Sequence, residues 1–137
     1  MPYRHVLVVC DGSSEGYDAV RAASELAARD RASLTVAAVV ELEHPGRCAS
    51  FGASAWNDVL IDAASADLEQ ARQIVQSPAS FTVLTGAKDQ AVADAGRERG
   101  CDVIVLPRPG RGVSRVFKRD RAKAMRRRTD CPVMPLP

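Results

Sequence analysis

The stretch VLVVCDGSS, residues 6–14, decides the fold. Its first five residues are apolar and mostly β-branched, which is typical of a strand buried on both faces of a parallel sheet. The next four, Asp11 to Ser14, end the strand and supply side chains that cap helix N-termini. The stretch predicts a buried strand that leads directly into a helix, with polar side chains at the junction.

Strand-like and helix-like segments alternate along the rest of the chain. A helix after residue 14 is indicated by apolar residues on one helical face, namely Val20, Ala23, Leu26 and Ala27. A β-branched run over 34–40 follows, and two strands joined by such a helix form a parallel βαβ unit. The remaining segments are a loop over 41–55, a helix over 56–76, a strand over 81–84, a short helix around 91–95 closed by Gly100, a strand over 103–106, a basic helix and a strand over 132–136. This order predicts one α/β domain over residues 1–137 with a largely parallel sheet.

Composition narrows the class of protein. With 46% hydrophobic and 26% charged residues, the chain has the make-up of a globular domain. No apolar run reaches the roughly 18 residues of a membrane span, and the first run is too short for a signal peptide, so we expect no membrane partner and a cytoplasmic location. The cysteines form no CxxC pair and only two histidines accompany them, so free thiols are expected and no metal site; they are Cys10, Cys48, Cys101 and Cys131.

Charge is distributed unevenly along the chain. Residues 108–128 contain ten Lys or Arg and one acid, for a local charge of +9, whereas the remainder carries −7. The run Arg126 to Arg128 is typical of a solvated helix end, where cations also favour the helix dipole. The alternative is an interaction surface for nucleic acid or an acidic partner, because so many basic residues exceed what capping requires.

Two loops are candidate ligand sites, because ligands of such sheets bind beyond the carboxyl ends of the strands. One is Asp11 to Ser14, where the carboxylate either accepts hydrogen bonds from a ligand or only shapes a turn and helix cap. The other is the Gly/Arg segment over 107–120. Neither GxxxxGK[ST] nor a GxGxxG after the first strand is present, nor is the GxSxG elbow, so no catalytic residues are predicted. Glu41 and Glu43 are expected to be solvated.

Both ends of the chain resemble the universal stress protein family. Residues 6–13, the alanine-rich helix and residues 32–36 resemble its start, while residues 101–106, the Gly/Arg loop and Cys131 to Val133 resemble its end. Gly86 also stands where the family usually has glycine. The resemblance implies a doubly wound, five-stranded parallel sheet of order 3-2-1-4-5 with helices on both faces. It also implies a stress-response role and, in many members, ATP binding through the pattern G-x2-G-x9-G-[S/T].

The family pattern transfers only in part. Asp11 falls on the family's ribose-contacting Asp, and Val39 or Val40 on the adenine-contacting position. Pro107 replaces the first glycine of the pattern, and Arg119-Asp120 replaces the closing Gly-Ser. The cofactor-binding residues implied by the resemblance are Asp11, Val39, Gly110, Arg111, Gly112 and Arg119.

The replaced positions change what the loop can bind. Pro107 has no N–H to donate, and Asp120 at a helix N-terminus would satisfy the donors that attract phosphate. The loop arginines act in the opposite sense, since guanidinium groups hold anions by charge-assisted bonds; they are Arg108, Arg111, Arg115 and Arg119. The favoured interpretation is a non-enzymatic binding or regulatory module that has lost tight ATP binding and has no firm cofactor. The alternative is an ATP-binding stress protein that uses Asp11, Gly110, Gly112 and the arginines, with weak ATPase activity as its least favoured form.

The last strand bears on self-association. The family commonly dimerises by pairing this strand across a two-fold axis. Here the strand contains Pro135, which cannot donate to a ladder and therefore either faces away from the sheet or prevents strand addition. A dimer through another surface and a monomer are the alternatives.

Overall fold

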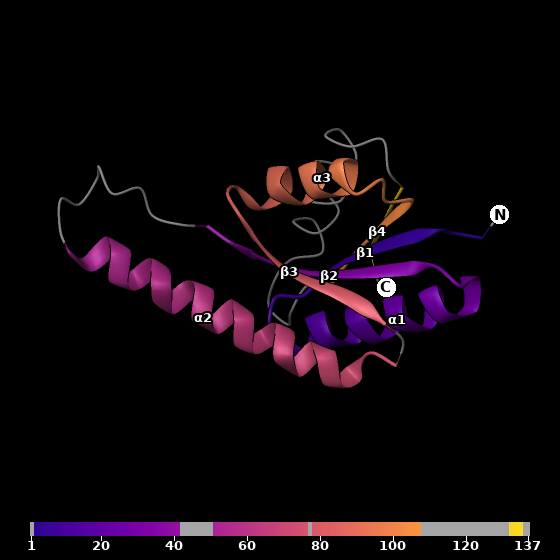
Figure 1. The fold of residues 1–137 in the computed structure, drawn as a ribbon, viewed down its shortest axis with the longest axis horizontal. Coiled ribbons are helices and arrows are strands. Elements are labelled where there is room, and N and C mark those ends of the chain that lie inside the picture. The colour runs from indigo at the N-terminus through magenta and orange to yellow at the C-terminus, as the bar shows by residue number, and fades with distance from the viewer. Residues whose placement is uncertain (1, 42–50, 77, 108–131, 136–137) are drawn as a thin grey trace.

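The computed structural model describes residues 2–41, 51–76, 78–107 and 132–135. Strands and helices alternate through these residues (Figure 1). The elements are β1 (His5–Val9), α1 (Ser14–Asp30), β2 (Ser33–Val40), α2 (Phe51–Ile74), β3 (Ala79–Thr85), α3 (Lys88–Glu98), β4 (Val103–Leu106) and β5 (Val133–Pro135).

The strands form one parallel sheet in the order β3-β2-β1-β4-β5. Val8 at the middle of β1 is aligned with Val36 of β2 and with Val105 of β4. The three-residue β5 adds to β4, with Val133 opposite Ile104. The expected α/β architecture with a parallel sheet is confirmed, and its central strand is the apolar run at residues 6–9.

Helices cover both faces of the sheet. Val6 and Val8 point to the face where the core includes residues of α1 and α2, whereas Leu7 and Val9 point to the face covered by α3. Figure 1 shows α1 and α2 on one side of the strands and α3 on the other. The four β1 residues from Val6 to Val9 are each at most 1% exposed, which is why no polar residue stands between His5 and Asp11.

The predicted loop over 41–55 was too long. Helix α2 begins at Phe51, five residues before the expected start, and ends at Ile74. Gly52 and Ser54 suggested a loop, but they alternate with Ala53 and Ala55, and alanine has the highest helix propensity. Residues 42–50 and the predicted basic helix after β4 lie outside the described residues.

The turn between α1 and β2 depends on one residue with a left-handed backbone conformation. Arg31 has φ 56° and ψ 40°, and its N–H is directed at the carbonyls of Ala27 and Ala28. The N–H of Ala32 bonds to the Ala27 carbonyl at 2.8 Å, and that of Ser33 bonds to Arg4 at the start of β1 at 2.9 Å. This two-residue turn therefore sends the chain from the helix directly into the parallel strand.

Replacing Arg31 with glycine should stabilise the protein. An L-residue in the left-handed region is strained by about 1 kcal/mol, and glycine is not, so we expect Arg31→Gly to raise the free energy of unfolding by about 0.5–1 kcal/mol. The matched control is Arg21→Gly, in the helical part of α1, which should lower it by about 1 kcal/mol. Urea denaturation measures both, and a loss of stability in Arg31→Gly would contradict the role assigned to this turn.

Candidate functional site

The site is built at the carboxyl edge of the sheet, where β1, β2 and β4 end. The last residue pair between β1 and β2 is Val9 with Ala37, and the Cys10 N–H still bonds to the Ala37 carbonyl at 2.8 Å. Asp11 and Val39 each lie two residues beyond that pair. The structure therefore brings these two predicted site residues to the same level of neighbouring strands. Asp11 is exposed, and Val39 is half-buried opposite Leu84 of β3, where it packs against the core on the α3 side.

Asp11 shapes the turn between β1 and α1. Its Oδ1 accepts hydrogen bonds from the N–H of Ser13 at 3.1 Å and from the Ser13 hydroxyl. Ser13 is the N-cap of α1, and its Oγ accepts from the Gly16 N–H at 3.0 Å. The interpretation of this loop as a turn and helix cap is thus correct for Oδ1. Both bonds go to that oxygen, and a carboxylate has further acceptor capacity at its other oxygen, Oδ2.

Glu41 caps the N-terminus of α3. The N-cap residue of that helix, Ala87, has no capping side chain, and Glu41 Oε1 accepts from the Lys88 N–H at 3.1 Å instead. This structural role of Glu41 could not be predicted from the sequence, because Glu41 and Lys88 are 47 positions apart. One N–H donor at the N-terminus of each helix, that of Gly16 in α1 and that of Lys88 in α3, is therefore already bonded to a side-chain oxygen.

Asp67 of α2 is the site residue that the sequence interpretation missed. A Cβ atom built on Gly12, which has φ +80°, would lie 2.5 Å from Asp67 Oδ2 and 2.8 Å from its Cγ. The carboxylate therefore rests directly against the backbone of the β1–α1 turn. Its signal in the sequence is a charged residue between Ala64 and Ala71, both of which α2 buries against the sheet.

Burial and neighbouring negative charges raise the pKa values of three groups around this turn, those of Asp67, Cys10 and Tyr17. Burial raises the pKa of the half-buried Asp67 carboxyl, and the charge of Asp11 raises it further. Burial also raises the pKa of the Cys10 thiol; the Gly12 N–H opposes this, whereas the charges of Asp67 and Asp11 add to it. The pKa of the Tyr17 hydroxyl is raised by burial and then by the charge of Asp67. Among the described residues, the end of β1 thus brings acidic groups close together in a partly buried setting.

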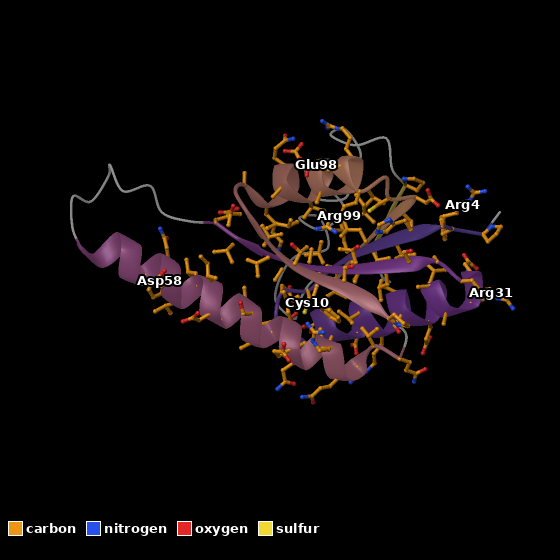
Figure 2. All side chains as sticks on the ribbon, in the orientation of Figure 1. Arg4, Cys10, Arg31, Asp58, Glu98 and Arg99 are labelled. Atoms are coloured by element: carbon orange, nitrogen blue, oxygen red, sulfur yellow. The ribbon has the colours of Figure 1, made fainter. Side chains whose placement is uncertain are left out.

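Cys10 lies within this region but away from solvent. It is 1% exposed and belongs to the core between the sheet and the helices α1 and α2, where Figure 2 labels it. A buried thiol with a raised pKa is a poor nucleophile. Cys10 therefore acts as a small apolar residue under the turn.

The remaining predicted residues are not brought together by what the structure describes. Pro107, the first residue of the Gly/Arg loop, is half-buried after β4, and the other residues of the loop lie outside the described ranges. Gly110, Arg111, Gly112 and Arg119 lie outside the described residues, as does the rest of the basic segment. His5 is at the opposite end of β1, where its Nε2 is 3.0 Å from Thr35 Oγ1.

Among the residues that the structure describes, no three His, Cys, Asp or Glu side chains are grouped so as to hold a metal ion. No helix among the same residues has the length and apolar character needed to cross a membrane.

Comparison with known proteins gives a consistent result at the level of family and fold. The family model described as the universal stress protein family matches residues 2–137. No curated protein matches the sequence.

Solved structures of this family share the fold. Universal stress protein UspA from Lactobacillus plantarum is 21% identical, with a TM-score of 0.84 and coverage of 100% of this chain and 99% of that one. A universal stress protein in complex with cAMP is 21% identical, with a TM-score of 0.68 and coverage of 99% and 98%. The universal stress protein from Archaeoglobus fulgidus in complex with dAMP is 16% identical, with a TM-score of 0.63 and coverage of 100% of both chains. The family match over nearly the whole length, on a sheet with the strand order described above, shows that this chain belongs to the universal stress protein family.

Proposed function

We propose that the protein is a non-catalytic binding module that takes an adenine nucleotide of low charge at the carboxyl edge of its sheet and no longer binds ATP tightly. The observation that carries this proposal is the pair of carboxylates at the β1–α1 turn, with Asp67 against Gly12 and Asp11 beside it. These charges favour ligands with one or two phosphate charges over a triphosphate.

Adenine-nucleotide binding is supported by the position of Asp11 and Val39. Each lies two residues beyond the last residue pair of β1 and β2, which is consistent with one ligand at this edge that contacts both. A carboxylate suits the hydroxyls of a ribose, and an apolar valine suits the face of a base. The relatives bound to cAMP and dAMP show that this fold accepts adenine nucleotides with one phosphate group.

Weak binding of a triphosphate is supported by three backbone positions at this edge that cannot donate freely to a phosphate. The N–H groups of Gly16 in α1 and Lys88 in α3 are bonded to Ser13 and Glu41. Pro107, which begins the loop after β4, has no N–H. A polyphosphate would meet carboxylates where such sites normally present backbone amides.

The competing proposal is tight ATP binding through the loop arginines. Four arginines between residues 108 and 119 would each add a charge-assisted bond to a phosphate oxygen. Affinity would then rise with each added phosphate. The order of affinities for ligands of different charge therefore separates the two proposals.

A non-catalytic role is supported by the bonding of Ser13, the hydroxyl nearest the turn. Its Oγ donates to Asp11 and accepts from Gly16, so both functions of the hydroxyl hold the helix cap. No histidine is among these partners to act as a base.

Calorimetric titration tests the proposal. At about 150 mM salt, where long-range charge effects are screened, we expect cAMP to bind most tightly, AMP less so, and ATP at least tenfold (about 1.4 kcal/mol) more weakly than cAMP. Asp11→Ala should abolish cAMP binding, whereas Asp18→Ala, which removes an exposed carboxylate of α1, should leave it unchanged. An affinity that rises from cAMP to ATP would refute the low-charge proposal, and unchanged binding in Asp11→Ala would refute the site.

Asp67→Asn should increase both stability and ATP affinity. The pKa of Asp67 is raised in the folded state, so the ionised carboxylate destabilises the folded protein. This destabilisation begins near the ordinary Asp pKa and is complete once the pH has risen through the folded pKa. We therefore expect Asp67→Asn to be more stable than the wild type at pH 7, with the difference vanishing below pH ~4, near the ordinary Asp pKa. Removing the charge should also strengthen ATP binding by about threefold to tenfold.

Thermal denaturation across pH, together with the same titration, measures these effects. The matched control is Asp62→Asn, which neutralises an exposed carboxylate elsewhere on α2. Equal gains in both variants would show that the effect reflects net charge and not the contact of Asp67 with the turn.

A further inference from the structure

Strand β3 forms one end of the sheet. It pairs with β2 over its whole length, from Ala79 opposite Leu34 to Thr85 opposite Val40. In the part of the chain that the structure describes, no strand pairs with its other side. Figure 1 looks onto this edge, with β3 in front of β2 and with α2 and α3 on opposite sides of it.

The backbone groups directed away from β2 can be identified. The N–H of Gly86, just past β3, bonds to the Val40 carbonyl of β2 at 3.1 Å. Because successive residues of a strand direct their N–H and C=O groups to opposite sides, the even-numbered residues of β3 face β2. The odd-numbered residues therefore face outward; they are Ala79, Phe81, Val83 and Thr85.

The seven residues of β3 lack the residue types that usually prevent strand addition. Residues 79–85 read ASFTVLT, with no charged residue, no proline and no glycine. Natural sheets commonly protect edge strands with such residues or with bulges. Arg72 of α2 lies over the Phe81 ring, 4.5 Å from its centroid, which places it on the α2 face of the strand and not along its hydrogen-bonding edge.

The sequence of β3 is complementary to itself in one antiparallel register. A two-fold axis at Thr82 pairs Phe81 with Val83 of the second copy, and Ala79 with its Thr85. All outward-facing N–H and C=O groups of both strands then find partners. On the α2 face the register joins an aromatic to a β-branched side chain, and on the α3 face it joins Thr82 to its own counterpart, both of which are favourable cross-strand pairs.

The opposite edge of the sheet is a poorer template. The Ile104 N–H bonds to the Pro132 carbonyl at 2.9 Å, so Pro132 and Met134 face β4, while Val133 and Pro135 face outward. Pro135 thus leaves the ladder with β4 intact but removes a donor from the outer side. Of the three residues of β5, only Val133 offers an outward N–H.

From these observations we infer that the protein self-associates through β3, by antiparallel addition of a second copy about a two-fold axis at Thr82. The product is a continuous sheet that has the α1 and α2 helices of both copies on one face and both α3 helices on the other. This dimer does not depend on nucleotide binding.

Charged substitutions at Thr82 test the register. The Cβ atoms of directly opposed residues lie only about 5 Å apart, so like charges at this position repel. We expect the wild type to be dimeric by sedimentation-velocity ultracentrifugation, and Thr82→Lys and Thr82→Asp each to raise the dimer dissociation constant at least about tenfold. An equimolar mixture of the two variants should dimerise again, because the opposite charges then meet.

The control is Ala28→Lys, which adds the same charge at an exposed position of α1 and should remain dimeric. Circular dichroism establishes that each variant is folded. A monomeric wild type, or Thr82 variants that dimerise as the wild type does, would overturn the proposal.

Hydrogen exchange of the unmodified protein gives a second test that needs no variant. The outward amides of Phe81 and Val83 should be protected at concentrations where the dimer forms, and should exchange at least about tenfold faster when the protein is diluted to the monomer. Fast exchange of these amides at every concentration would also overturn the proposal.

Discussion

The structure depends on one constraint, the complete burial of β1. This strand is paired on both sides and covered on both faces, so each of its residues from Val6 to Val9 must be apolar. The first position at which the chain can present a charge is Asp11, beyond the last residue pair. The chain must also turn there into α1, and the hydrogen bonds from Ser13 to Asp11 make that turn. The place of the candidate site therefore follows from the burial of the strand that precedes it.

Three carboxylates at the carboxyl edge of the sheet have structural roles. Asp11 forms the turn, Glu41 caps α3, and Asp67 sits on the backbone of Gly12. Each carboxylate meets a structural need, and together they make this edge acidic among the described residues. The basic segment over 108–128 carries the opposite charge in the same chain. The ligand preference that we propose is therefore a balance between these acidic side chains and the basic segment.

Much of the architecture could be predicted from the sequence because the signals were local. The apolar run at β1 and the helical stripe of α1 predicted their elements and, through the βαβ rule, the parallel sheet. The predicted start of α2 was wrong because the glycine and serine residues that follow Phe51 are compatible with either a loop or a helix. The turn at Arg31 could not be foreseen, since the left-handed position that commonly holds glycine holds arginine here.

The site was predictable only where the residue lies next to a strand end in the sequence. Asp11 and Val39 could be placed because Asp11 follows one recognisable strand and Val39 lies in the last two residues of another. The roles of Asp67 and Glu41 could not, because their partners, Gly12 and Lys88, lie about 50 residues away along the chain and meet them only in the fold.

The contact between Gly12 and Asp67 has an evolutionary consequence. A side chain at position 12 would displace the carboxylate at position 67, and the positive φ at Gly12 adds strain of its own. A larger residue at 12 therefore requires the side chain at 67 to rotate away or to be smaller. Among relatives that keep this turn, we expect these two positions to vary together, so that substitutions in α2 follow those in the β1–α1 loop.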